Sequence, residues 1–181
     1  MKRTMYKWFW IWNFDKEERW LNEMAEKGLA LTSVGYCRYT FEPCEPGEYT
    51  VRLELLDNLP TNAQSEQYIR FVESTGAEHI DSLFRWIYFR KKSSLGAFDL
   101  YSDFDCRIRH LNRILVLIAG ITPLMIVNAL RFLLEYYEGW PDVFHLAVGL
   151  FFAAFSATAV YGVVRVSLMK RRLKQEHRLY E

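Results

Sequence analysis

Recognisable catalytic and metal-binding motifs are missing from this sequence. Its four histidines are scattered, and none has a Cys, Asp or Glu partner at metal-site spacing. There is also no glycine-rich phosphate loop, no nucleophile elbow and no paired-acid signature that stands out from ordinary surface charge. The sequence therefore predicts a protein that is not an enzyme and that holds no cofactor or metal.

Cysteine is scarce. Cys37, Cys44 and Cys106 are an odd number of thiols in no metal-ligand spacing, so we interpret them as free thiols in a reducing compartment. The N-terminus also lacks a signal peptide, because its aromatic run is not followed by a small-residue cleavage site.

Charge is nearly absent from two runs in the last third of the chain, residues 114–134 and 143–164. In the first run only Asn128 and Arg131 are strongly polar, and the second has no Lys, Arg, Asp or Glu. At about 1.5 Å per residue, the runs reach about 31 and 33 Å as helices, which matches the hydrocarbon core of a bilayer. A buried helix of a soluble core is the alternative, but two adjacent runs of this length favour a transmembrane hairpin over residues 114–169.

Basic residues flank both runs on the side of the termini. The loop between the runs is acidic, with Glu135, Glu138 and Asp142. Because Lys and Arg near the ends of membrane helices stay on the cytoplasmic side, we predict a plasma-membrane protein with both termini cytoplasmic. The predicted membrane-surface basic residues are Arg107, Arg109, Arg113, Lys170, Arg171 and Arg172.

The formal charge of +1 hides a division along the chain. Residues 1–100 hold 13 Lys/Arg and 15 Asp/Glu, whereas residues 101–181 hold 10 and 7. The basic excess is thus next to the membrane runs, which suits anionic lipid better than nucleic acid. We expect the lipid bilayer as a partner and no direct binding of nucleic acid.

Residues 1–95 predict a cytosolic α+β domain with a sheet that carries helices on one face. Asp15 and Glu18 resemble a capping box for the first helix, and Gly28 and Gly76 terminate the two helices. A shift of 48 residues superposes the two halves, which predicts two strand-helix-strand-strand repeats. The expected strands are 6–12, 29–34, 36–41, 49–56, 77–81 and 84–91, and the expected helices are 15–27 and 63–75.

Two further segments complete the predicted organisation. Residues 96–113 form a juxtamembrane linker with an amphipathic helix that runs into the first span, and residues 170–181 form a basic cytosolic tail. Small residues in the second span suit close helix packing, within the hairpin or between protomers of a homo-oligomer. They are Gly149, Ala153, Ala157 and Gly162.

Strand alternation predicts one sheet face that is aromatic with a few charges. Its members are Trp8, Trp10, Trp12, Arg38, Arg52, Trp86 and Tyr88. Three interpretations stay open: a groove for a flat or amphiphilic ligand, a protein-binding surface, or a second core layer covered by the linker.

Several short motifs occur in a characteristic order. They are KWF at 7–9, FDKEERWLN at 14–22, AEKG at 25–28, RYTFE at 38–42, EPGEY at 45–49, YIRF at 68–71, TGAE at 75–78 and FRWIYFRK at 84–91. Over roughly residues 6–113 the chain resembles a bacterial family known as domain of unknown function 2812. The resemblance implies a companion of a PadR-type transcription regulator, often with a membrane tail, and no catalytic residue. The repeat layout is also similar to the GyrI-like ligand-binding superfamily, by pattern alone.

The main functional hypothesis is a membrane-anchored sensing or interaction domain, regulatory in role and linked to a PadR-type regulator. The first alternative is an accessory protein that binds amphiphilic small molecules on its aromatic face, for example in resistance. The second alternative is a membrane-bound enzyme whose catalytic residues meet only in space.

Overall fold

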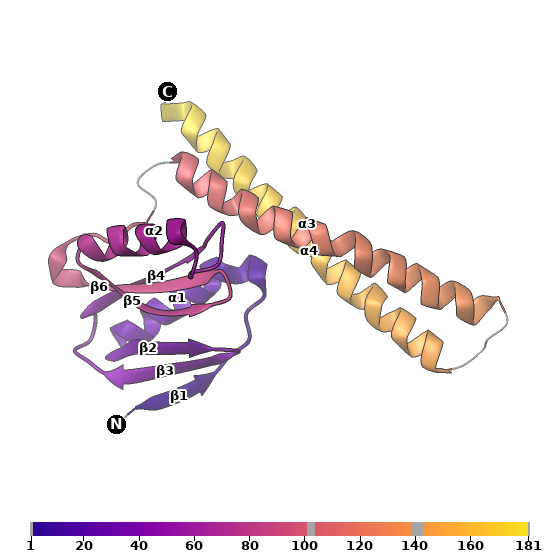
Figure 1. The fold of residues 1–181 in the computed structure, drawn as a ribbon, viewed down its shortest axis with the longest axis horizontal. Coiled ribbons are helices and arrows are strands. Elements are labelled where there is room, and N and C mark those ends of the chain that lie inside the picture. The colour runs from indigo at the N-terminus through magenta and orange to yellow at the C-terminus, as the bar shows by residue number, and fades with distance from the viewer. Residues whose placement is uncertain (1, 101–103, 139–142, 181) are drawn as a thin grey trace. The chain divides into compact units, whose positions relative to one another are not determined.

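A computed structural model describes residues 2–100, 104–138 and 143–180, with side chains in residues 2–100, 108–138 and 143–175. The chain divides into two compact units, residues 1–110 and 111–181. The first is an α+β unit and the second is a pair of long helices, as predicted (Figure 1).

The α+β unit contains two copies of the order strand, helix, strand, strand. The first copy is β1 (Arg3–Tyr6), α1 (Phe14–Glu26), β2 (Leu29–Gly35) and β3 (Arg38–Pro43), with a short 3-10 helix, η1 (Ile11–Asn13), before α1. The second copy is β4 (Tyr49–Leu55), α2 (Ala63–Ser74), β5 (Ala77–Leu83) and β6 (Trp86–Lys92), followed by η2 (Ser93–Leu95).

The ends of the helices follow local chemistry. Gly28 follows α1 with φ +77°, and a Cβ there would lie 2.9 Å from the Cys44 carbonyl oxygen, so no other residue fits without a shift. At the start of α2, the Asn62 side chain accepts a hydrogen bond of 3.0 Å from the Gln64 N–H. The predicted capping box at Asp15 is wrong, because the residue at the N-cap of α1 is Asn13 and its side chain does not cap.

The two copies build two antiparallel sheets with the same strand order, β1-β3-β2 and β4-β6-β5. Each sheet has a register shift at the same place, between Leu31 and Ser33 in β2 and between His79 and Asp81 in β5. These positions are 48 residues apart, which is the shift predicted from the sequence.

Strands β2 and β5 lie side by side and join the two sheets. The Asp81 Oδ2 atom accepts hydrogen bonds from the Ser33 hydroxyl at 2.9 Å and from the Val34 N–H at 3.0 Å. The Arg90 guanidinium reaches the Glu42 carboxylate at 3.3 Å. Ser33 and Asp81 are 48 residues apart, and so are Glu42 and Arg90. Contacts between equivalent positions are typical of a two-fold arrangement, so an approximate two-fold axis relates the copies.

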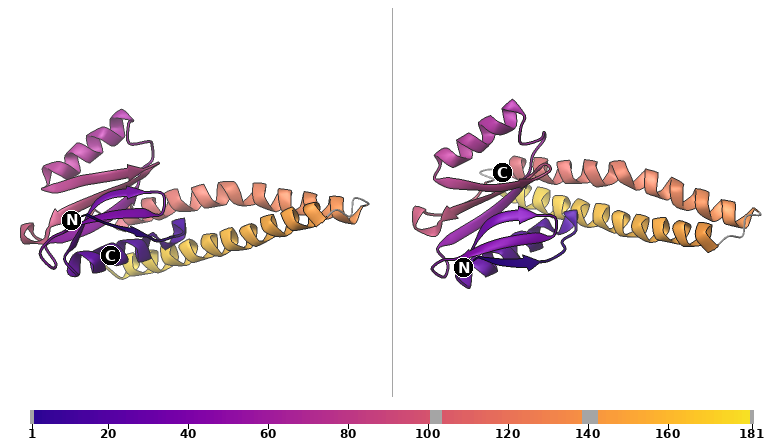
Figure 2. Two further views of the ribbon diagram at one scale, coloured as in Figure 1. Left: turned by 90° about the horizontal axis from the view of Figure 1, so that it is seen from below. Right: turned by 60° about the horizontal axis from the view of Figure 1, so that its bottom comes forward.

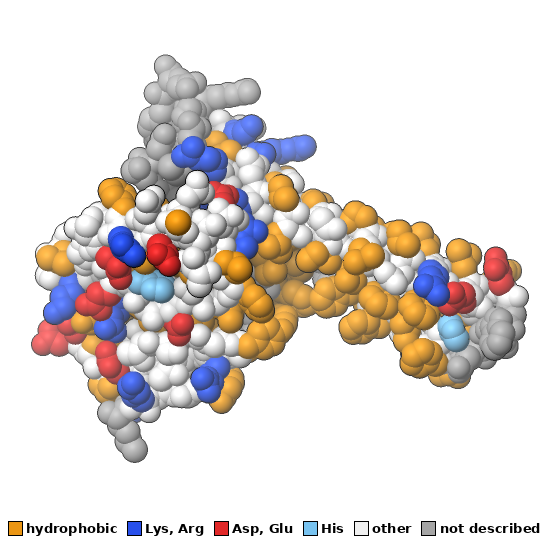
Figure 3. Space-filling model, viewed as in Figure 1, with side chains coloured by type: hydrophobic (Ala, Val, Ile, Leu, Met, Phe, Trp, Pro, Cys, Tyr) orange, Lys and Arg blue, Asp and Glu red, His pale blue; other side chains and the backbone are white. Residues whose placement is uncertain are grey.

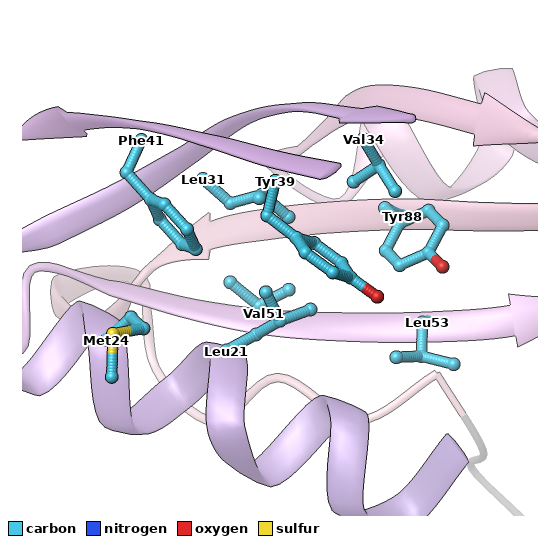
Figure 4. Packing of buried hydrophobic residues seen from close by; sticks show 9 residues of the cluster. All are labelled: Leu21, Met24, Leu31, Val34, Tyr39, Phe41, Val51, Leu53 and Tyr88. Atoms are coloured by element: carbon cyan, nitrogen blue, oxygen red, sulfur yellow. The ribbon is translucent and has the colours of Figure 1, made fainter. Parts of the chain in front are cut away.

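The arrangement of the helices differs in one respect from the expectation of one sheet with helices on one face. Strand residues alternate between faces. Tyr88 belongs to the core beneath α1, whereas Ile87 and Phe89 belong to the core beneath α2. Helices α1 and α2 therefore cover opposite faces of sheet β4-β6-β5. The α1 core draws on both sheets and contains Leu21, Met24, Leu31, Val34, Tyr39, Phe41, Val51, Leu53 and Tyr88 (Figure 4).

The predicted strand 6–12 is wrong for most of its length. Strand β1 ends at Tyr6, which pairs with Arg38, and the Lys7 N–H then donates to the Cys37 carbonyl in the β2–β3 turn. Strand β3 begins at Arg38, so beyond this point the N-terminal segment has no strand to pair with. Its aromatic residues pack against one another instead and lead into η1.

The second unit is a hairpin of α3 (Phe104–Tyr137) and α4 (Val143–Tyr180), which run alongside each other in every view (Figure 2). Both helices are long and apolar enough to cross a membrane, over Ile108–Tyr137 and Val143–Gln175. Few of their large apolar side chains are buried, and orange surface extends along the helices (Figure 3). A core helix of a soluble protein would bury such residues, so the hairpin indicates membrane association. The predicted tail at 170–181 continues α4 as far as Tyr180.

Close packing within the hairpin occurs at Gly149, where a Cβ would lie 2.9 Å from two side-chain atoms of Leu133. Phe132 and Phe152 stack nearby, with ring centroids 6.0 Å apart. Of the predicted packing residues, Gly149 and Gly162 are buried, Ala153 is half-buried, and Ala157 is exposed. The exposure of Ala157 shows that α3 does not cover it in the hairpin.

The polar residues of the first apolar run have partners close by in the same helix. Asn128 donates to the Leu124 carbonyl at 2.8 Å, and Arg131 pairs with Glu135 at 3.0 Å. Pro123 lies inside α3 without ending it. Asn128 and Arg131 are therefore paired within α3 itself.

Candidate functional site

Strand β4 is an edge strand, and α1 supplies the hydrogen bonds that its edge would otherwise lack. The Asn22 amide accepts from the Val51 N–H at 2.9 Å and donates to the Val51 carbonyl at 2.9 Å. One turn earlier, Glu18 accepts from the Leu53 N–H at 3.3 Å and pairs with Arg52 at 3.2 Å. Glu18 and Asn22, which are one helical turn apart on α1, thus bond to Leu53 and Val51, which are two residues apart on the strand edge.

The next outward N–H of β4 bonds to the beginning of α3. His110 Nδ1 lies 3.4 Å from the Leu55 nitrogen and accepts its hydrogen. The His110 ring also contacts Phe14 and Trp86 edge-on, with centroid distances of 5.0 and 5.8 Å. His110 is the last residue of the α+β unit, and α3 continues from it without a break.

Glu17 is a buried carboxyl group beneath the sheets. Its Oε1 atom accepts hydrogen bonds from the hydroxyls of Tyr39 and Tyr88, both at 2.8 Å (Figure 4 shows the two hydroxyls). Burial raises the pKa of Glu17, and the two hydroxyls oppose this shift without cancelling it. Burial, reinforced by Glu17, also raises the pKa of both tyrosines, so they keep their protons and act as donors.

Aromatic side chains gather where β1 ends. Trp8 is 52% exposed and meets Trp10 and Tyr36 edge-on at 5.5 and 5.9 Å. Trp10 in turn stacks on the buried Trp12 at 5.0 Å. Tyr36, in the β2–β3 turn, is 70% exposed. This arrangement gives a surface of large rings that is anchored at one end in the core.

The predicted aromatic face is therefore divided among three environments. Trp8 and Trp10 reach the surface, and Arg38 is exposed close to them. Trp86 and Tyr88 contact the buried clusters around His110 and Glu17. The remaining two members are Trp12, which is buried, and Arg52, which pairs with Glu18.

The predicted membrane-surface arginines and lysines lie on α3 and α4. Arg109, Arg171 and Arg172 are exposed, and Arg113 and Lys170 are half-buried. The side chain of Arg107 falls outside the described residues. Among the residues that are described, no three His, Cys, Asp or Glu side chains are grouped so as to hold a metal ion.

Sequence reasoning missed Glu17, Asn22 and His110 as site residues. Each looked like an ordinary polar residue, because the sequence does not show which strand edge or which tyrosines it meets. The spacing of Glu18 and Asn22, on one helix face opposite an alternating strand, is the one signal that was present.

Fold and site define a class of protein: a duplicated α+β domain whose edge strand is bonded to the helix that begins a hairpin of membrane-spanning length. Within that class, the chain belongs to the family described as "Protein of unknown function (DUF2812)", whose model matches residues 13–122, more than half of the chain. The matched region extends from the start of α1 into α3. Comparison with curated proteins and with solved structures found no match.

Proposed function

We propose that the protein is a membrane-anchored, non-enzymatic sensing and interaction protein whose α+β unit lies in the cytoplasm. One observation carries this proposal: a single helix, α3, holds both His110 on the edge of β4 and an apolar run of spanning length. A change at the sheet edge would therefore act on a residue of the same helix that carries the apolar run.

The cytoplasmic placement has a direct test in the native thiols Cys37 and Cys44. In a Cys106→Ser background, a membrane-impermeant maleimide should label them in inverted vesicles and leave them unlabelled in intact cells. A cysteine introduced at Glu138, in the acidic connection, should show the opposite pattern as a matched control. Labelling of Cys37 in intact cells would reverse the orientation.

The proposed regulatory partner is a PadR-type regulator, as the family resemblance implies. Full-length protein in detergent should retain such a regulator on an affinity column, and the interaction should survive high salt if it is largely apolar. Because His110 bonds to the sheet edge, His110→Ala should alter regulator output in cells while membrane insertion persists. Unchanged output in this variant would disconnect the sheet edge from regulation.

A second candidate function is binding of amphiphilic compounds, which the exposed rings of Trp8 and Tyr36 favour. Tryptophan fluorescence of the full chain in lipid discs should shift or quench on titration with planar amphiphiles, and Trp8→Ser should reduce the response. A flat titration across a diverse panel would remove this candidate.

A further inference from the structure

One end of sheet β1-β3-β2 carries exposed rings and basic groups together. It is formed by the end of β1, the residues that follow, and the β2–β3 turn, which the bond from Lys7 N–H to the Cys37 carbonyl holds together at 3.0 Å. We call it the basic aromatic end, and its exposed members are Tyr6, Lys7, Trp8, Tyr36 and Arg38.

The charge of this end is of one sign. Residues 6–14 and 35–38, which build it, contain Lys7 and Arg38 and no Asp or Glu. The equivalent segments of the second copy, residues 54–62 and 83–86, contain one arginine and two acidic residues. The second copy also exposes a ring at its turn, because Phe84 is 76% exposed. The same fold thus has only basic charges around the exposed ring in one copy and charges of both signs in the other.

Tryptophan and tyrosine rings next to Lys and Arg have the chemistry of the interfacial zone of a bilayer, where the rings sit at headgroup level and the cations meet anionic lipid. An acidic protein surface would satisfy the cations as well, but it would not need three polar-tipped rings. The hairpin would also keep the domain beside the bilayer, which raises the local concentration of lipid far above that of any free partner.

We propose that the basic aromatic end binds the anionic headgroup surface of the bilayer, as a second membrane contact besides the hairpin. This inference rests on the proposed membrane anchoring and cytoplasmic orientation, and it names the lipid surface as the amphiphile that Trp8 and Tyr36 meet. Each basic residue near an anionic surface strengthens binding about fivefold, so Lys7→Gln with Arg38→Gln should lower the docked-to-undocked ratio about 30-fold.

The test uses two native cysteines at opposite ends of β3, since Cys37 precedes the strand and Cys44 follows it. The full chain, with a single NBD fluorophore on either thiol, is reconstituted into discs of phosphatidylcholine alone or mixed with phosphatidylglycerol. Nitroxide-labelled headgroups serve as the quencher. On Cys37 the emission should shift to the blue and be quenched when phosphatidylglycerol is present, and on Cys44 it should not change.

Two variants separate the contributions. Lys7→Gln with Arg38→Gln should abolish the response to phosphatidylglycerol, and Trp8→Ser, at an exposed position, should weaken it without unfolding the domain. Phe84→Ser, at the equivalent turn of the second copy, should leave the Cys37 signal as it is.

Each other outcome overturns the proposal in a distinct way. An unchanged Cys37 signal in a chain that resists alkaline carbonate removes the second contact and leaves the anchoring intact, whereas release by carbonate removes the anchoring itself. An equal response at Cys44 would mean an unspecific approach to lipid. The same response of the Cys37 fluorophore to short-chain phosphatidylglycerol below its micelle concentration would mean a site for free amphiphiles. A blue shift of the Cys37 emission only when an acidic protein is added would mean a protein-binding surface.

Discussion

The two copies of the strand-helix-strand-strand unit follow the same path with different chemistry. Equivalent positions keep the strand order, the register shift and the glycine after each helix, but α1 has Glu17 and Asn22 where α2 has Ser65 and Arg70. Glu17 bonds to two buried tyrosines and Asn22 covers the edge of β4, whereas Arg70 makes only an exposed pair on α2. The two copies thus share the backbone path, whereas the polar groups at equivalent positions of the two helices differ.

The largest expected effect comes from Glu17→Ala. It leaves two buried tyrosine hydroxyls without their acceptor and opens a cavity, so the α+β unit should lose about 2–4 kcal/mol of stability. Ser65→Ala, at the equivalent buried position, should cost about 1 kcal/mol or less. Denaturant unfolding of the full chain in mild detergent would measure both. Equal losses would mean that the two copies are energetically alike.

Asp81→Ala tests the joint between the copies and should cost about 1–3 kcal/mol, because the Val34 N–H and the Ser33 hydroxyl lose their acceptor. Approximate two-fold symmetry makes a sharper prediction. Exchanging the two residues, as Ser33→Asp with Asp81→Ser, should restore most of the stability that Asp81→Ala loses. Hydrogen exchange of the amides in β2 and β5 would measure the restored stability. If the exchanged pair were as unstable as Asp81→Ala, the two-fold axis would be contradicted.

Asn22→Ala should cost about 1–2 kcal/mol, since it removes two hydrogen bonds from the edge of β4. Arg70→Ala, at the equivalent position, should change stability by no more than about 0.5 kcal/mol, because its pair with Glu66 is exposed. Faster hydrogen exchange of the Val51 amide in Asn22→Ala, but not in Arg70→Ala, would show that the loss of stability arises at the edge of β4. Equal changes of stability in the two variants would show that the edge of β4 does not depend on α1.

The smallest effect is a pH dependence of opposite sign at two carboxyls. Burial raises the pKa of Glu17, so its contribution is fully present below the unfolded value of about 4.3 and is lost as pH rises through the folded pKa. Burial on its own would raise the pKa of Asp81, but hydrogen bonds from Val34, Ser33 and Ser82 lower this pKa overall. Its contribution is present above the unfolded value of about 3.9 and is lost as pH falls through the folded pKa.

Unfolding midpoints of Glu17→Gln and Asp81→Asn measured across acidic pH would separate the two groups. Relative to wild type, Glu17→Gln should gain stability as pH rises through the raised pKa of Glu17. Asp81→Asn should lose stability relative to wild type as pH rises through the lowered pKa of Asp81. Identical slopes in the two variants would contradict the assignment.

Much of the fold was predictable because its signals are local. The alternation in β4, the turn glycines Gly28 and Gly76, and the 48-residue shift each lie within a short stretch, and the apolar runs needed only length and composition. The aromatic run at 6–12 was misassigned because strand preference describes side chains that pack on any surface, and here they pack on one another. The site was harder to predict, since Tyr88 approaches Glu17 only when both sheets meet over α1.

The covered edge of β4 has a consequence for biosynthesis. Three of its outward amides, those of Val51, Leu53 and Leu55, bond to Asn22, Glu18 and His110, and His110 is made long after the strand itself. In a nascent chain the Leu55 amide therefore lacks its His110 acceptor until α3 begins to leave the ribosome, when the first apolar segment is also being made. Completion of this strand edge and synthesis of the first apolar segment are thereby tied to the same stage of translation.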